Sequence, residues 1–319
     1  MNKTIACLAA VLILPGPLFA QAWPERAVRV VVPYSAGSTP DGLARTLFSK
    51  VSENTGQTFI VDNRPGASAM VGTNMVAKAK PDGHTLVFAS SGPMDVNTLL
   101  FKEMPYDPFN DLKPITLAAH GHTVLVVSNS VKAQDAKGLL QEVAANGSKY
   151  AYGTSGVGSG QHLSLADLFS RGGADVVHVP FGGIPQVVAA LISDNIQIAA
   201  LPVQTAVTMI QAHRLRAIAA FGSERAIQLP DLPTLKEQGV DFSTIGWMGV
   251  ATTARTPPAV ANAIHAQIAK ALQDSEVGNG FRKQGFEPAI QSQDEFRKFM
   301  LGEVERWRPV IKRNSIMLQ

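Results

Sequence analysis

The sequence is nearly free of cysteine. One cysteine, Cys7, occurs among 319 residues, and it lies in an apolar stretch close to the N-terminus. It comes too early for a lipid-attachment site, and it lacks the Leu-x-x that would precede one. A chain cleaved beyond Cys7 would have neither a thiol nor a disulfide, so cysteine chemistry is excluded for the mature protein.

Long hydrophobic runs are also lacking. The apolar run at residues 5–13 is too short to span a membrane, and no later run is long enough. Together with a basic start and the small-x-small pattern at residues 20–22, this run predicts a signal peptide over residues 1–22, cleaved after Ala22. Export without disulfides indicates the bacterial periplasm and no direct membrane insertion.

Basic clusters and catalytic signatures are missing as well. The net charge of +3 comes from scattered residues with no Lys/Arg-rich block, so nucleic-acid binding is not supported. The sequence has no Gly-x-Ser-x-Gly elbow, no phosphate-binding P-loop and no His-Glu-x-x-His motif. Gln161 stands where the third glycine of a dinucleotide fingerprint would follow Gly156 and Gly158. We therefore expect no catalytic residue and no cofactor.

The seven histidines do not cluster with carboxylates at the spacing of metal ligands. His120 and His122 form a close pair, but two ligands do not make a metal site. We expect this pair to lie in a loop or hinge, and we predict no bound metal.

Strands and helices alternate along the rest of the chain, which predicts an α/β fold with a largely parallel sheet. With 319 residues, 45% of them hydrophobic, the chain is long enough for two domains. Residues 107–112 are interpreted as a polar connection, and a short helix is expected at residues 229–239. Strands are expected at residues 28–32, 58–61, 84–88, 123–127, 150–152, 176–179, 196–201, 216–220 and 245–251.

The first strand leads into a loop of small residues that ends at Asp41. Asp41 is expected to be the N-cap of the next helix, because its carboxylate can accept hydrogen bonds from the first free amides. Those amides could bind an anion, since a helix N-terminus favours negative charge. By itself the loop could equally be an ordinary strand-to-helix turn without a ligand.

Four loops share this composition and follow the carboxyl ends of predicted strands. They lie at residues 35–41, 90–92, 153–159 and 181–183, and they are rich in Gly, Ser or Thr and poor in charge. Open α/β sheets bind ligands at this edge. Loops of this kind facing one another across a cleft would offer many N–H and O–H donors, which can bind a carboxylate without burying an unpaired cation.

Two aromatic residues allow two interpretations each. His162, beside the loop at residues 153–159, could donate to an anion or help to start the following helix. Trp247 could line a cleft or pack between domains, and packing is the more common role. The aromatic stripe of the last predicted helix, residues 293–314, is expected to belong to the core.

Motifs spread over nearly the whole chain resemble those of the substrate-binding proteins of tripartite tricarboxylate transporters, the Bug receptors. The longest is Val-Val-Pro-Tyr-x-Ala-Gly-x-x-x-Asp-x-x-Ala-Arg at residues 31–45. Others are Asn-Arg-Pro-Gly-Ala at 63–67, Pro-Asp-Gly at 81–83, Leu-Pro-Asp-Leu-Pro-Thr at 229–234 and Glu-x-x-Arg-Trp at 303–307.

The resemblance implies a two-domain, periplasmic-binding-protein-like fold of the type II, Venus-flytrap kind. Residues 23–123 and 246–319 would form the first domain, and residues 124–245 the second. The cleft would close by a hinge around a small carboxylate, and a monomer would deliver it to membrane permease subunits.

The resemblance also implies which residues contact the ligand. Family members hold one carboxyl group through the first loop and through the Gly/Ser loop of the second domain. Asp41 is expected to cap rather than to touch the ligand. The candidates carried over are Tyr34, Ser35, Ala36, Gly37, Ser38, Asp41, Ser90 and Ser91 in the first domain, and Thr154, Ser155, Gly156, Ser159, Phe181 and Gly183 in the second.

Three positions depart from the family pattern. Ser38 stands where a second glycine is usual, and Phe181 stands where Tyr followed by a basic residue is usual. Leu201 takes the place of an acid near the end of a strand in the second domain. Because both charged groups are lost, we hypothesise a ligand with an apolar or aromatic body and at least one carboxylate, rather than citrate.

Two other functions are compatible with the same sequence. A receptor that signals to a sensor kinase would need the same closing cleft, and gene neighbourhood would distinguish it from a transport receptor. A periplasmic enzyme that uses a Ser or His in the cleft is disfavoured, because no nucleophile–base signature is present.

Overall fold

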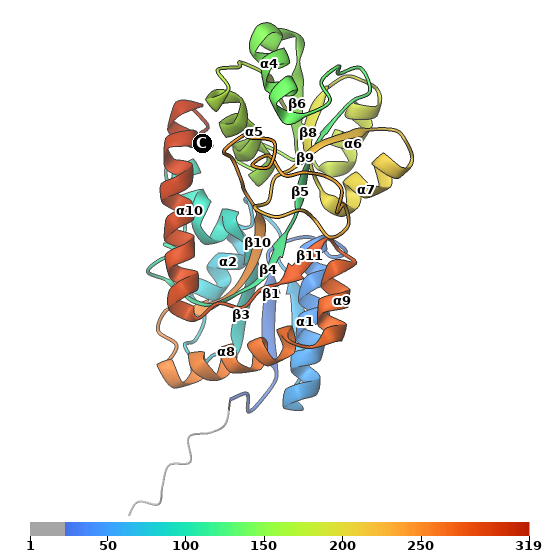
Figure 1. The fold of residues 1–319 in the computed structure, drawn as a ribbon. Coiled ribbons are helices and arrows are strands. Elements are labelled where there is room, and N and C mark those ends of the chain that lie inside the picture. The colour runs from blue at the N-terminus through green and yellow to red at the C-terminus, as the bar shows by residue number, and fades with distance from the viewer. Residues whose placement is uncertain (1–22, 319) are drawn as a thin grey trace, which may run out of the picture.

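The structure is a computed structural model that describes residues 23–318. The predicted signal peptide, residues 1–22 with Cys7, lies outside the described residues. The described chain forms two β-sheets with helices on both faces of each sheet (Figure 1). The predicted α/β class is confirmed.

The first sheet has six strands in the order β11-β4-β10-β3-β1-β2. β1 pairs in parallel with β2 and β3, whereas β10 is antiparallel to β3 and β4. The parallel strands therefore end at one common edge. The bounds are β1 Val28–Val32, β2 Phe59–Asn63, β3 Thr85–Ser90, β4 Leu112–Gly121, β10 Gly246–Thr253 and β11 Phe286–Pro288.

Helices cover both faces of the first sheet. In β1, Val30 packs into the core under α1, α8 and α9, whereas Val31 packs into the core under α2 and α10. A run of β-branched residues suits this position because successive side chains of a strand point to opposite faces. The bounds are α1 Thr39–Thr55, α2 Met70–Ala77, the π-helical turn η1 Gly92–Val96, α3 Asn97–Leu100, α8 Pro258–Leu272, α9 Ser275–Arg282 and α10 Gln293–Arg313.

The second sheet has five strands in the order β7-β6-β8-β5-β9. β6 is parallel to β7 and β8, and β5 is antiparallel to β8 and β9. Its strands are β5 Thr123–Val127, β6 Ala151–Thr154, β7 Val177–Pro180, β8 Ile198–Pro202 and β9 Arg216–Ala220. Its helices are α4 Ala136–Asn146, η2 Gly147–Lys149, α5 Gly160–Arg171, α6 Ile184–Ile192 and α7 Val203–Gln211.

The chain passes between the two sheets at His122, which joins β4 to β5, and it returns to the first sheet at the start of β10. The long helix α10 runs beside both parts (Figure 1). Trp307 and Ile311 of α10 share a core with Leu163 of α5 and Leu100 of α3. The predicted domain limits at residues 123 and 246 stay a prediction.

Three expected elements differ from the structure. Residues 112–121 form β4 because they pair with β10, so Leu112 belongs to a strand rather than to a connection. The helix expected at residues 229–239 is wrong: the backbone of Pro233 and Leu235 bonds to Ala220 at the end of β9 instead. His120 lies within β4, and His122 alone lies between strands.

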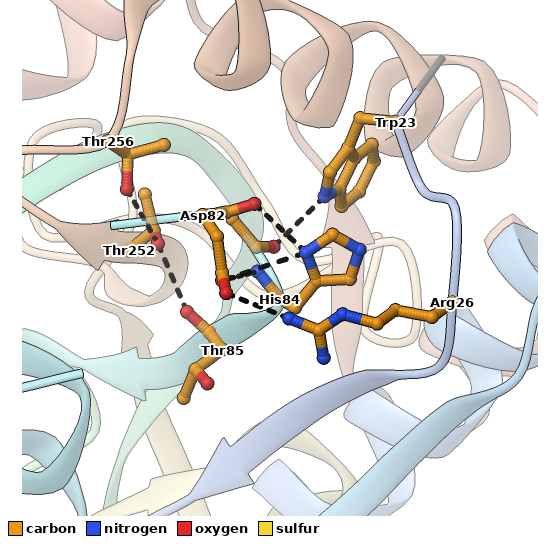
Figure 2. A network of polar contacts seen from close by, with 8 residues as sticks. Trp23, Arg26, Asp82, His84, Thr85, Thr252 and Thr256 are labelled. Atoms are coloured by element: carbon orange, nitrogen blue, oxygen red, sulfur yellow. Dashed lines mark hydrogen bonds and ion pairs between the residues drawn. The ribbon is translucent and has the colours of Figure 1, made fainter. Parts of the chain in front are cut away.

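A polar network fastens the start of the described chain to the first sheet (Figure 2). The indole Nε1 of Trp23 donates to the Gly83 carbonyl at 3.1 Å, and Arg26 pairs with Asp82 at 2.8 Å. Asp82 also accepts from the backbone N–H of His84 at 2.9 Å. These contacts precede β3, so they lie at the end of the parallel strands opposite to the loops described next.

Candidate functional site

A cavity of about 520 Å³ lies where the carboxyl ends of β1 and β3 face the N-terminus of α5. Its first wall includes Tyr34, Ser90 and Ser91, and its second wall is the segment 155–161 that leads into α5. A third wall comes from β10, the two residues before it, and α10. The residues of that third wall are Thr244, Ile245, Gly246, Trp247, Met248, Glu303 and Trp307.

The predicted site residues divide into two groups. Five of them line the cavity: Tyr34, Ser90, Ser91, Ser155 and Ser159. The other nine do not line it, although several are sequence neighbours of residues that do. They are Ser35, Ala36, Gly37, Ser38, Asp41, Thr154, Gly156, Phe181 and Gly183. Ligand contact by any of the fourteen stays a prediction.

Tyr34 and Ser90 join the two strand ends of the first wall. Their hydroxyl oxygens are 2.5 Å apart, and the backbone N–H of Ser90 donates to Tyr34 Oη at 3.2 Å. Burial raises the pKa of Tyr34, although its bonds with Ser90 act against this rise. The phenol is therefore held in place as a neutral group in the cavity wall.

Asp41 is not the N-cap of α1, contrary to the expectation from sequence. The N-cap is Ser38, whose hydroxyl makes no capping bond, and Asp41 lies in the first helical turn. The Asp41 carboxylate accepts from Gly37 N at 2.9 Å, Asn63 Nδ2 at 3.0 Å and Arg45 Nε at 3.1 Å. Burial alone would raise the pKa of Asp41, but these bonds hold it below its ordinary value. Asp41 thus ties the first loop to β2.

Residues 90–92 do not form the expected loop. Strand β3 continues to Ser90, and the chain enters the π-helical turn η1 at Gly92. The Ser91 hydroxyl donates to Asp95 Oδ1 at 2.6 Å. Asp95 is wholly buried, so desolvation raises the pKa of its carboxyl well above the ordinary value. The hydroxyl of Ser91 is thereby committed to Asp95.

The second wall is held by side chains that bond to their own loop. Ser159 is the N-cap of α5, and its hydroxyl accepts from the backbone N–H of His162. The imidazole Nδ1 of His162 in turn accepts from the backbone N–H of Gly158 at 3.0 Å. His162 therefore helps to shape the start of the helix, and it does not line the cavity.

Thr154 and Ser155 are also engaged within this part of the chain. The Thr154 hydroxyl is within 2.7 Å of His178 Nε2 and bonds to the Gly156 carbonyl at 3.1 Å. Ser155 Oγ donates to Gln161 Oε1 at 3.1 Å. Ser155 and Gln161 both line the cavity, so this pair can exchange its internal bond for a bond to a ligand.

The loop at residues 181–183 lies apart from the cavity. Phe181 packs against the hydrophobic core that contains Leu201, and its backbone N–H donates to the Thr154 carbonyl at 2.9 Å. Gly183 is the N-cap of α6. Phe181 and Leu201 thus pack in the same hydrophobic core of the second sheet, and neither lines the cavity.

Trp247 lines the cavity, which is one of the two roles that the sequence allowed, and it packs within the core of the first sheet rather than between domains. It packs edge-on against Phe296 and Phe299, with ring centroids 5.5 and 5.6 Å away, and it also lines the cavity. Trp307, expected only in the core, lines the cavity too. The motif around Trp307 was visible in the sequence, but helical periodicity alone could not separate a cavity wall from a core.

The cavity has few ionisable groups. Among the described residues that line it, only Glu303 and Tyr34 carry a titratable side chain, and none is Lys, Arg or His. Within residues 23–318, no group of three or more His, Cys, Asp or Glu side chains could hold a metal ion. Hydroxyls, amides and apolar groups therefore dominate the interior.

None of the described helices combines the length and the apolar composition that crossing a membrane would require.

Two mixed sheets, joined by strands that pass between them and enclosing a cavity of this kind, define a two-domain, periplasmic-binding-protein-like fold. The family described as "Tripartite tricarboxylate transporter family receptor" matches residues 43–316. The chain belongs to this family, which is one of solute-binding receptors and includes the Bug proteins.

Curated relatives span nearly the whole chain. The "UPF0065 protein in tcbD-tcbE intergenic region" of a Pseudomonas species is 32% identical over 292 residues, which cover 91% of this chain and 87% of that protein. Protein BugT of Bordetella pertussis is 29% identical over 325 residues, which cover 100% of this chain and 99% of BugT.

Solved structures share the fold at similar coverage. Rpa4515 of R. palustris with adipate has a TM-score of 0.81 and 29% identity, over 92% of this chain and 99% of that one. MatC of Rhodopseudomonas palustris with bound malate has a TM-score of 0.77 and 26% identity, over 91% of this chain and 100% of MatC. Both are thus carboxylate complexes of the same fold.

Proposed function

We propose that this receptor captures a small carboxylate with an apolar or aromatic body in the periplasm and delivers it to the permease subunits of a tripartite uptake system. The composition of the cavity carries the proposal. Hydroxyls and backbone amides line two of its walls, and no lining residue among those described is cationic. A volume of about 520 Å³ suits a small organic ligand.

The carboxylate would bind at the second wall. Segment 155–161 carries the Ser155 hydroxyl and the first free amides of α5, a helix of twelve residues from Gly160 to Arg171. Free N–H groups and the positive end of the helix dipole stabilise an anion there. This position needs no buried cation, which agrees with the absence of one from the described lining.

The body of the ligand would lie against the third wall. Ile245, Trp247, Met248 and Trp307 line that wall, with Val96 and Leu100 nearby in the same cavity. Burying apolar surface here contributes roughly 25 cal/mol per Å². A ligand that carries several carboxylates, such as citrate, would have to desolvate charges against these side chains without a cationic partner.

Delivery would require the two sheets to close around the bound acid by rotating at the crossings near His122 and Gly246. The adipate and malate complexes of the two solved relatives support a carboxylate ligand, and the family supports the transporter partner. In this scheme the protein binds and releases its ligand unchanged.

The test is calorimetric titration of the full chain, produced in a bacterial periplasm and refolded from denaturant to remove any retained acid. We expect aliphatic or aromatic monoacids to bind and citrate to bind at least about tenfold more weakly, a difference of about 1.4 kcal/mol. Tight binding of citrate without binding of any monoacid would overturn the proposal. Native mass spectrometry before refolding would identify the retained acid.

A further inference from the structure

Glu303 is the one carboxylate among the described residues that line the cavity. It lies on α10, one turn before Trp307, and 12% of its side-chain surface is exposed. The rest of the third wall is mostly apolar. A carboxylate at such a wall is costly unless its oxygens receive hydrogen bonds.

The two oxygens of Glu303 differ in their partners. Oε2 accepts from the indole Nε1 of Trp307 at 3.0 Å. Oε1 accepts no hydrogen bond from the described residues, and the nearest cation is Arg306 Nη1 at 3.8 Å. That guanidinium is directed elsewhere, because it bonds to the Ser243 carbonyl and lies 4.8 Å from the centre of the Trp307 ring.

Ser91, which lines the same cavity, is also not a donor to Oε1. The Ser91 hydroxyl, on the first wall, donates to Asp95. Asp95 is a buried carboxyl whose pKa is raised chiefly by desolvation, and the charge of Glu303 adds to that rise. Burial raises the pKa of Glu303, and the hydrogen bond from Trp307 and the charge of Arg306 only partly offset that rise. Glu303 Oε1 is thus an acceptor in the cavity wall without a hydrogen-bond donor.

We propose that the ligand supplies this donor: it carries a hydroxyl or amino group, remote from its carboxylate, that hydrogen-bonds to Glu303 Oε1. The inference rests on the proposed function and narrows its ligand class to hydroxy or amino acids with an apolar middle. A ligand with a second carboxylate at that end is disfavoured, because it would place two negative charges together. Glu303 is then a specificity-determining residue of the binding site.

The experiment compares ligands that differ only at the remote end. The refolded protein is titrated with the unbranched acids from butyrate to octanoate, with their ω-hydroxy and ω-amino forms, and with the matching dicarboxylates. At the best chain length, we expect an ω-hydroxy or ω-amino acid to bind about tenfold tighter than the plain acid, as for one bond to a charged group. The dicarboxylate should bind more weakly than the plain acid.

Glu303→Gln tests the residue itself. Its amide oxygen can still accept from Trp307, so the fold should be kept. We expect the affinity for the dicarboxylate, relative to that for the ω-amino acid, to rise by about tenfold. Glu305→Gln, at an exposed position of the same helix, is the matched control and should keep the wild-type order of ligand affinities. Circular dichroism of both variants checks the fold.

The outcomes separate the two proposals. If plain acids bind but neither ω-substituted form binds more tightly, the role of Glu303 is refuted while the proposed function stands. The same holds if Glu303→Gln leaves the order of ligands unchanged. If no acid in the series binds, and no other monoacid does, the proposed function itself fails.

Discussion

The imidazole rings of His162 and His178 stack almost in parallel behind the second wall of the cavity, with centroids 3.7 Å apart and an angle of 9° between planes. Tyr152 continues the stack, 4.9 Å from His178. His162 Nδ1 accepts a hydrogen bond from Gly158 and therefore carries no proton. The loop that lines the cavity thus depends on a neutral histidine.

This stack predicts acid sensitivity of the fold. Burial and the neighbouring His178 lower the pKa of His162 from 6.5 to about 4, and burial lowers the pKa of His178. A pKa that is lowered on folding means that the unfolded chain takes up the proton first. The free energy of unfolding should fall as the pH drops from about 6.5 to about 4, by on the order of 2 kcal/mol.

Denaturant unfolding measured across this pH range checks the prediction. His162→Phe keeps a flat ring in the stack but cannot take up a proton, so its stability should depend less on pH. His213→Asn, at an exposed position, is the control and should keep the wild-type dependence. An unchanged pH dependence in His162→Phe would contradict the prediction.

Replacing Asp41 should loosen the first loop. The Asp41 side chain is only 6% exposed and accepts from Gly37, Asn63 and Arg45. Asp41→Ala leaves these donors without a partner, and we expect the free energy of unfolding to fall by about 2 kcal/mol. Glu53→Ala, which removes an exposed ion pair from the same helix, should cost less than about 0.5 kcal/mol. Equal losses in the two variants, measured by urea unfolding, would refute this account.

A methyl group on Gly158 should disturb the cavity. Gly158 has a φ of +76°, and an added Cβ would lie 2.6 Å from Leu100 Cδ1, which also lines the cavity. Gly158→Ala should therefore lower the affinity for the carboxylate as well as the stability. Gly173→Ala has a similar φ of +68° with no atom within 4 Å, so it should cost about 1 kcal/mol of stability without loss of affinity. Equal affinities of the two variants by calorimetry would show that the contact with Leu100 is unimportant.

Asp95 should make the fold less stable at higher pH. Its buried carboxyl has a pKa well above 3.8, so the folded chain holds a proton that the unfolded chain releases. The contribution of Asp95 to the free energy of unfolding is complete at a pH below its pKa in the unfolded chain. It is lost as the pH rises through its pKa in the folded chain. Asp95→Asn cannot lose a proton and should be at least as stable as wild type at about pH 8. Chemical denaturation at about pH 5 and about pH 8 measures the difference. The exposed substitution Asp175→Asn is the control, and a wild-type pH dependence in Asp95→Asn would be the opposing result.

Regular elements with strong local signals were predicted well. Strands Val28–Val32 and Arg216–Ala220 have the expected bounds, because β-branched and apolar residues lie between clear breaks. Strand Leu112–Gly121 was not predicted, because Pro114 and polar residues obscure its pattern. Pairing with β10 makes it a strand, and that partner lies far away in the sequence.

In the candidate site, too, local sequence patterns predicted some features and tertiary packing decided others. Tyr34, Ser90, Ser91, Ser155 and Ser159 were predicted from loops at strand ends, and they line one cavity. Local rules predicted that α1 starts at Asp41, but in the structure it starts at Thr39. The carboxylate of Asp41 instead accepts hydrogen bonds from Gly37, Asn63 and Arg45. A side chain that can cap a helix can equally bond to a distant strand, and only packing decides between them.

The sequence alone determined the α/β class, the alternation of elements and the receptor family, because each follows from local periodicity or from contiguous motifs. The tertiary structure decided the composition of the cavity. Tyr34 and Trp307 come from opposite ends of the chain, and they share a cavity because α10 packs on the sheet that contains β1. The buried carboxyl of Asp95, the free oxygen of Glu303 and the stacked histidines also depend on which side chains exclude water, and this depends on the three-dimensional packing.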